Sequence, residues 1–213
     1  MECFENWGIQ HAGLFTFAQS AKHVGFYQRF GFWPRFLTAV MSKPIAPDVR
    51  ARQWSTFGET AVDDREMVLS ACRALTNSIY AGLDVSREIS AVADQNLGDT
   101  VLLWEDSELL GLAICHIGPR TEAGSGTCYV KFGAARPGAA VEQTFGKLLD
   151  ACEELAGSHK TARLVAGMNT ARHEAYRQMQ ARGFHTDLQG VVMSQPNEDG
   201  YNRPGVYLID DWR

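Results

Sequence analysis

The hydrophobic residues of the chain recur at helical and at strand spacings, and the two patterns alternate. The clearest helix is predicted over residues 142–156, where one face is apolar and Gly157 follows: Phe145, Leu148, Leu149, Cys152 and Leu155. Other helices are predicted over 21–30, 64–80, 86–96 and 170–182. Runs rich in β-branched and aromatic residues predict strands over 13–17, 36–42, 100–104, 108–116, 128–134, 163–167, 186–194 and 206–209. This order predicts an α/β (α+β) fold with a right-handed βαβ unit from Cys128 to Gly167.

The beginning of the chain resembles its end. A Gly-Phe pair follows a helix in both places, at Gly31-Phe32 and Gly183-Phe184, and the triplet Val-Met-Ser recurs at 40–42 and 192–194. Upstream, Ala21-Lys22-His23 is aligned with Ala171-Arg172-His173, which makes the second helix two residues longer. We interpret the match as an internal repeat, and the alternative is two unrelated strand–helix–strand units.

This repeat predicts how the chain is divided. Residues 1–45 would be a partial domain that holds only a closing strand, helix and strand, 46–53 a linker, and 54–213 a complete domain. A few elements cannot bury a core of their own. The first segment must therefore pack on the complete domain or be completed by a second copy, and we predict a homodimer.

Composition excludes several classes of protein. The formal net charge is −5 and the pI about 5.7, so no nucleic-acid partner is expected. The apolar runs are too short to span a bilayer, and the acidic start does not resemble a signal peptide, so we expect a cytoplasmic protein without membrane contact. The five cysteines include no C-x-x-C pair, and neither a disulfide framework nor a metal site is predicted.

Several segments together resemble the GNAT N-acetyltransferase superfamily, and in particular bacterial proteins with two such domains in tandem. They are the helix–Gly-Phe–strand ending, the βαβ unit, and the segments at 16–23, 200–204 and 209–213. The resemblance implies a mixed, mostly antiparallel central sheet flanked by helices. It also implies acetyl-CoA as co-substrate, bound at the βαβ unit.

The resemblance assigns the acetyl-CoA site residue by residue. In the family, the central strand leaves its neighbour and its backbone pairs with pantetheine, which points to Lys131, Phe132, Gly133 and Ala134. The pyrophosphate binds at the start of the next helix, and the implied residues are Gly138, Ala139, Ala140, Val141, Glu142 and Gln143, with Asn169 nearby. The chain departs from the pattern here, because Val141 and Gln143 occupy the usual glycine positions.

The catalytic candidates follow from acetyl transfer to an amine, which needs a base and an acid. The family's acid is a tyrosine on the last helix, where Tyr176 lies; Tyr27 keeps the family's spacing better, and Tyr176 could instead be a packed aromatic. Candidate bases are Glu122 and His116. The terminal Asp210-Asp211-Trp212-Arg213 could hold a cation, or Asp211 could pair with an arginine. We expect an acyl-CoA-dependent N-acyltransferase that acts by direct attack of an amine acceptor, and the alternative is a non-catalytic sensing or assembly module with a degenerate site.

Overall fold

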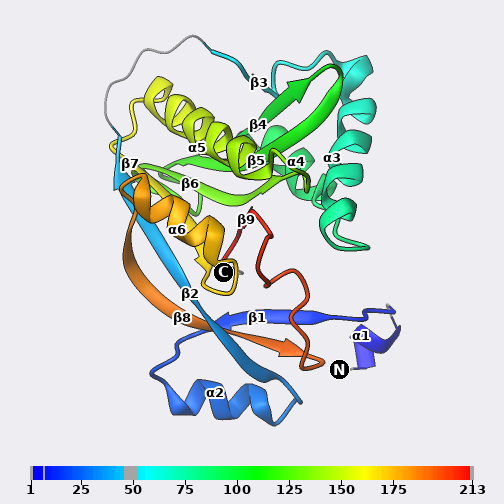
Figure 1. Cartoon of the computed structure of the whole chain (residues 1–213), viewed down its shortest axis with the longest axis vertical. Helices are drawn as coiled ribbons and strands as arrows, with labels where there is room; N and C mark the ends of the chain where they lie inside the picture. Colours follow the sequence, from blue (N-terminus) through cyan, green and yellow to red (C-terminus); the bar gives the residue numbers. More distant parts are fainter. Residues whose placement is uncertain (1, 7, 46–51, 212–213) are drawn as a thin grey trace.

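A computed structural model describes residues 2–6, 8–45 and 52–211 of the 213-residue chain. Its helices are α1 (Glu2–Asn6), α2 (Ala21–Gln28), α3 (Arg65–Ile79), α4 (Ser86–Asp94), α5 (Val141–Ser158) and α6 (His173–Ala181), with a 3-10 turn at Val62–Asp64. Its strands are β1 (Ala12–Thr16), β2 (Trp33–Pro44), β3 (Ser55–Thr56), β4 (Gly98–Glu105), β5 (Glu108–Gly118), β6 (Gly124–Ala135), β7 (Arg163–Asn169), β8 (His185–Gln195) and β9 (Leu208–Ile209). Figure 1 shows the helices on both sides of one twisted sheet.

The sheet confirms the predicted fold class. Its strands follow the order β1-β8-β2-β7-β6-β5-β4-β3, and β9 pairs with β6. The β6–β7 pair is parallel and every other described pair is antiparallel. The predicted helices and strands are all present near their expected bounds, whereas β3 was not expected. Crossover through α5 produces the single parallel pair, as the βαβ pattern indicated.

The N-terminal segment is part of this sheet. Strand β2 lies between β7 and β8 and pairs antiparallel with both. At its centre the Asn169 amide donates to Thr38 Oγ1 at 2.9 Å, and Lys43 Nζ lies 2.8 Å from Glu153 of α5. The segment therefore packs on the larger domain within one chain. A homodimer, and the division into a partial and a complete domain, stay predictions; most of the expected linker lies outside the described residues.

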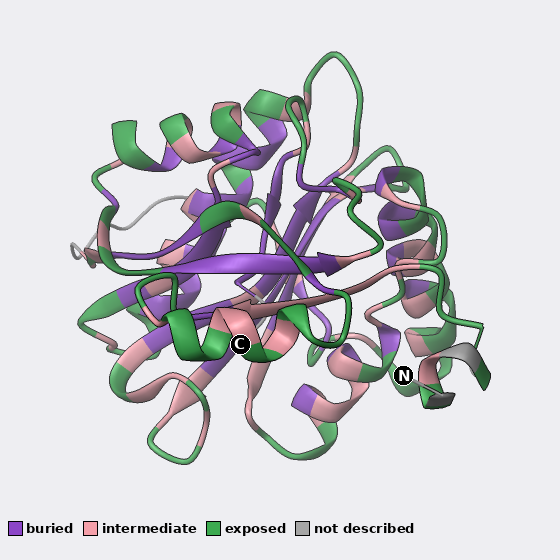
Figure 2. Ribbon diagram, turned by 90° about the horizontal axis from the view of Figure 1, so that it is seen from below, coloured by how far each residue is buried: buried purple, intermediate pink, exposed green. Residues whose placement is uncertain are grey.

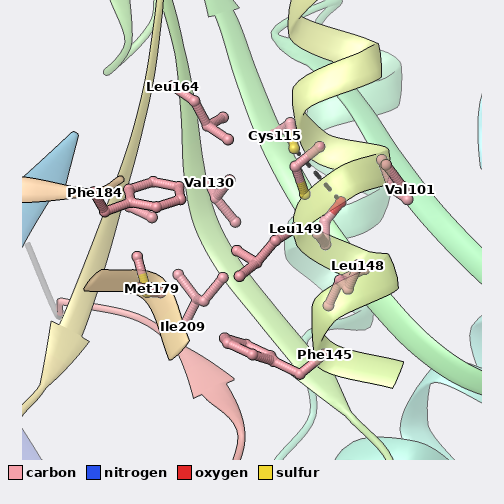
Figure 3. Packing of buried hydrophobic residues seen from close by; sticks show 14 of the residues in the cluster. Val101, Cys115, Val130, Phe145, Leu148, Leu149, Leu164, Met179, Phe184 and Ile209 are labelled. Carbon is pink, nitrogen blue, oxygen red and sulfur yellow. Dashed lines mark hydrogen bonds between the residues drawn. The ribbon is translucent and has the colours of Figure 1, made fainter. Parts of the chain in front are cut away.

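Two apolar clusters hold the larger part of the fold together. Figure 2 shows buried positions concentrated on the strands. One cluster joins the sheet to α5 and α6; in Figure 3 the α5 side chains Phe145 and Leu149 point toward Val130, Met179 and Phe184. The other joins the sheet to α3 and α4. A third, smaller cluster lies between α2, β1 and β8 and includes Phe32, Val191 and Met193.

The strand registers reveal how the two repeat units are related. Leu164 of β7 faces Lys43 as Ala12 of β1 faces Gln195, and both members shift by 164 − 12 = 195 − 43 = 152 positions. The same shift relates the rest of β1 to β7, and β2 to β8. The unit β1–α2–β2 thus pairs with β7–α6–β8 about a pseudo-twofold axis at the Thr38–Gly190 pair.

This shift corrects one detail of the sequence alignment. It places Ala21, the first residue of α2, on His173, the first residue of α6, so neither helix contains a two-residue insertion. Matching Ala21-Lys22-His23 with Ala171-Arg172-His173 was therefore wrong, and the two histidines are not equivalent. Tyr27 corresponds to Met179. The alignment was wrong because it relied on a short run of similar residues. The correct shift is determined by the register of the paired strands, which the sequence alone does not reveal.

Candidate functional site

The predicted site begins where β6 and β7 separate. The two strands pair from Thr127–Arg163 to Val130–Ala166, and their pairing ends there. Beyond it β6 continues through Lys131, Phe132, Gly133 and Ala134, the stretch that the resemblance assigned to pantetheine. A strand that leaves its neighbour exposes unpaired backbone groups, which must find other partners when they are buried.

Strand β9 supplies those partners. Gly133 pairs with Ile209 and Ala134 with Leu208, and the Ala135 amide donates to the Tyr207 carbonyl at 3.0 Å. On the β7 side, a Cβ added to Gly167 would lie 2.1 Å from the Cβ of Asp211, so the terminal segment packs directly on that glycine. Residues 207–211 therefore fill the gap between β6 and β7.

A buried arginine holds β9 in this place. Arg172, at the start of α6, has an exposed fraction of 0%. Its guanidinium donates to the carbonyls of Leu208 (2.7 Å) and Asp210 (3.3 Å) and to the Asp210 carboxylate (2.7 Å). Tyr201 donates its hydroxyl to the other oxygen of that carboxylate. Moving β9 out would leave buried charges without partners, which is strongly unfavourable.

Beside β9, a second group of buried polar side chains surrounds Tyr129. Its hydroxyl donates to Asp211 at 2.8 Å, and its ring makes an edge contact with the His116 ring at 6.3 Å between centroids. His116 is buried, and Glu88 Oε1 lies 3.4 Å from its Nε2 atom. Arg172 binds Asp210, and the expectation that Asp211 pairs with an arginine stays a prediction. Trp212 and Arg213 lie outside the described residues.

The start of α5 remains accessible. Ala139, Ala140, Glu142 and Gln143 line a hollow of about 640 Å³, together with Gly146, Lys147, Asp150, Gln178 and Arg182. The helix has no side-chain N-cap, and Gly138 precedes its first turn. Val141 points into the apolar cluster under α5. The acidic side chains of Glu142 and Asp150 line the hollow together with the cations Lys147 and Arg182. The carboxylates repel an anion, so the hollow is a poor match for a pyrophosphate.

The other predicted site residues are committed to contacts within the fold. Lys131 forms an ion pair with Glu122. Tyr176 packs against the α5 cluster, and its hydroxyl accepts from Gln180 at 3.4 Å. The Asn169 amide binds Thr38, and its oxygen accepts from the Ala171 amide at 3.0 Å. Among the contacts of the described residues, none joins Tyr176, Glu122 and His116 to one another.

Sequence reasoning missed the role of Arg172, which carries the site. An arginine at the start of a helix is typical of a solvated surface, and charged residues are seldom buried without a partner. The available signal was the terminal acidic pair at 210–211, for which a buried cation was one interpretation. Its partner could be identified only once β9 and the start of α6 were placed side by side.

The implied acetyl-CoA can be tested against these residues. Two of the four backbone positions that it would use on β6, Gly133 and Ala134, pair with β9, and the side-chain amide nitrogen and oxygen of Asn169 both have partners. The site residues in this conformation do not fit the co-substrate as the family binds it.

Two further observations concern the chain as a whole. No helix within the described ranges is long and apolar enough to cross a membrane. All five cysteines are free thiols, and burial raises the pKa of Cys72 to about 12. Such a thiol stays protonated and unreactive at neutral pH.

Comparison with known proteins gives the fold a name. No family model and no curated protein matches the chain. Among solved structures, it is similar to a GCN5-related N-acetyltransferase from Sphaerobacter thermophilus, with a TM-score of 0.57 and 13% identity over 87% of this chain and 59% of the other. For a GCN5-related N-acetyltransferase from Anabaena variabilis, the TM-score is 0.54 and the identity 11%, over 91% of this chain and 47% of the other. For a glucosamine N-acetyltransferase region of a fungal multi-domain β-N-acetylglucosaminidase, the TM-score is 0.61 and the identity 10%, over 91% of this chain and 26% of the other.

Identities this low compare architectures and not active sites. The chain also spans less than two thirds of the first structures that it matches, 59% and 57%. The sheet order, the βαβ unit through α5 and these superpositions agree with one another. This chain has the fold of the GNAT N-acetyltransferases.

Proposed function

We propose that the chain is a non-catalytic module with the N-acetyltransferase fold, which works in assembly and no longer binds acyl-CoA. The observation that carries this proposal is the pairing of β9 with β6 at Gly133 and Ala134, held by the buried Arg172–Asp210 pair. The missing glycines at the start of α5 support it, since the exposed side chain of Gln143 lines the hollow where backbone would approach phosphate. Because all five cysteines are free, we propose that it works in the reducing cytoplasm.

The second candidate is the acyl-CoA-dependent N-acyltransferase, which would transfer acetyl to an amine acceptor by direct attack. Its support is the fold and the accessible hollow beside the start of α5. Tyr176, Glu122 and His116 remain its candidate catalytic residues. It requires residues 207–211 to leave the gap between β6 and β7.

Thermal unfolding against increasing acetyl-CoA separates the two candidates. A ligand at a hundred times its dissociation constant stabilises the native state by about 2.7 kcal/mol, so binding must raise Tm. We expect no change up to millimolar acetyl-CoA and no release of free CoA with a panel of amines.

A saturable rise in Tm would contradict the module and favour the enzyme. The variant Gln143→Glu then serves as a matched control, because Gln143 is exposed and lines the hollow. A carboxylate there repels phosphate, so a rise that the variant abolishes would come from the implied site.

A further inference from the structure

The two repeat units have the same backbone but unequal surroundings. In β7–α6–β8, the outer edge of β7 pairs with β6, and α5 lies against α6. In β1–α2–β2, described residues pair β1 with β8 alone. The edge of β1 that corresponds to the β6-bearing edge of β7 is therefore an open strand edge, which is a template for another strand.

The helix α2 is open on the corresponding side. Besides the apolar packing of α6 on α5, two polar contacts reach α5: Gln178 of α6 donates to the Glu142 carbonyl at 3.0 Å, and Arg182, which follows α6, donates to the Asp150 carboxylate. Shifted by 152 positions, they become Phe26 and Phe30, which are 53% and 46% exposed. No residue of α2 is buried. Figure 2 views the molecule from below, the end at which α2 lies in Figure 1. Two phenylalanines thus stand in water at the positions where the other unit meets its covering helix.

The small apolar cluster repeats only part of the large one. Each member of the cluster around Phe32 has a counterpart in the α5 cluster at the same shift: Phe4 with Ala156, Ala12 with Leu164, Leu14 with Ala166, Val24 with Tyr176, Tyr27 with Met179, Phe32 with Phe184, Val191 with Ala39 and Met193 with Met41. The large cluster adds the apolar face of α5, which includes Phe145, Leu149 and Cys152 and appears in Figure 3. Among the described residues, no such apolar helix face lies over the small cluster.

The short helix α1 extends the correspondence to the covering helix itself. Glu2–Asn6 falls on residues 154–158, the last residues of α5. Both segments end alike: the Ile9 amide donates to the Phe4 carbonyl at 2.9 Å, and the Thr161 amide to the Ala156 carbonyl at 3.1 Å. Gly8 and Lys160 both have a positive φ, 66° and 55°. The N-terminal unit therefore begins as the other unit does, at the end of an α5-like helix.

We propose that the outer edge of β1 and the Phe26–Phe30 face of α2 are a docking surface for a strand–helix unit built like β6–α5, carried by an acetyltransferase-fold half domain on another polypeptide segment. The strand pairs parallel with β1, and the helix covers α2. Because Phe30 stands where Arg182 binds Asp150, the docking helix has an apolar residue in place of that aspartate. This specifies the partner of the assembly module and rests on that proposed function.

A fusion supplies the probe from the chain's own sequence. A copy of residues 54–158 replaces residues 1–6 and is joined to Trp7, which reproduces the connection from α5 to β7. The appended copy carries Asp150→Leu to match Phe30. Amide hydrogen exchange of residues 12–16 is then compared between the fusion and the unmodified chain, for the amides that face away from β8.

We expect these amides to exchange at least about tenfold more slowly in the fusion, because docking must open before they exchange. Adding Phe26→Ser and Phe30→Ser to the fusion should restore fast exchange. An appended copy that keeps Asp150, without the Asp150→Leu substitution, should protect these amides less. These two phenylalanines are exposed, so their loss leaves the rest of the fold intact.

Two results would overturn the proposal. One is fast exchange at β1 in the fusion, whether the appended copy folds apart or stays unfolded. The other is slow exchange in the unmodified chain together with a dimeric mass, which would assign the surface to a second copy. Neither readout depends on acetyl-CoA, so this test and the Tm titration fail independently.

Discussion

The units β1–α2–β2 and β7–α6–β8 show what a backbone unit determines and what its neighbours determine. Both have the same strand register, and both helices are followed by glycine with positive φ, Gly31 at 82° and Gly183 at 86°. Their burial differs: α6 is covered by α5, and α2 carries no buried residue. Shared local geometry therefore does not imply a shared role.

The difference is sharpest in the gap beside each first strand. In the second unit Gly167 leaves room for Asp211, and the terminal segment fills the gap. In the first unit Phe15 occupies the position of Gly167, and its ring lies against Gly190: a Cβ there would be 2.2 Å from it. At this position of the first strand, a distant segment packs on Gly167 in one unit, whereas in the other unit the strand's own Phe15 side chain packs on Gly190.

The largest expected effect comes from the starts of the two helices. Arg172→Leu leaves Asp210 buried without its cation, and breaking a buried pair destabilises by about 3–5 kcal/mol. The equivalent Ser20→Ala removes only an N-cap, which is worth about 1 kcal/mol. Urea unfolding should show a several-fold larger loss of unfolding free energy for Arg172→Leu than for Ser20→Ala. Adding Asp210→Leu to Arg172→Leu should recover part of the loss, and equal effects at Arg172 and Ser20 would refute the buried network.

The next comparison removes the equivalent phenylalanines. Phe184 is 3% exposed and contacts the α5 cluster, so Phe184→Ala should lower the free energy of unfolding by about 3–5 kcal/mol. Phe32 is 8% exposed in the small cluster, and we expect roughly half of that loss from Phe32→Ala. Equal losses would mean that the first unit is as well covered as the second.

A smaller effect is expected where the units cross. Gly190→Ala forces a methyl group into the Phe15 ring, and overpacking of this kind costs about 1–3 kcal/mol. Gly25 in α2 has no atom within 4 Å of an added Cβ, so Gly25→Ala should stabilise by about 0.5–1 kcal/mol. Opposite signs in thermal unfolding would confirm the contact, and a neutral Gly190→Ala would exclude it.

The smallest effect concerns a carboxylate that braces the terminal segment. The Gly205 amide donates to Glu174 at 3.0 Å and holds the pKa of Glu174 below its usual 4.5. A lowered pKa contributes stability above the unfolded value, and this contribution is lost as pH falls through the folded one. Glu174→Gln should therefore be slightly less stable than the unmodified protein at pH 7, and the difference should shrink as the pH falls below 4.5. A difference that persists unchanged in acid would contradict this interaction.

Much of the fold follows from local signals. Helix α5 was predictable because its apolar stripe is long, and the βαβ unit because strand, helix and strand follow at the right spacing. The insertion of β2 between β7 and β8 was not, since it depends on pairing across 131 residues, as between Thr38 and Asn169. The site depended on the same kind of distant contact: β9 pairs with β6, and Arg172 with Asp210. Neither leaves a periodic pattern in the sequence.

The place of β2 also bears on the order in which the protein folds during synthesis. Its two neighbours, β7 and β8, are translated more than a hundred residues later, so β2 leaves the ribosome long before any strand can pair with it. Such nonlocal pairing slows folding and exposes strand edges meanwhile. The middle elements can associate first, and closing the sheet around β2 is expected to be the late step. A nascent chain held on the ribosome should therefore keep its first 45 residues sensitive to protease until β8 has emerged.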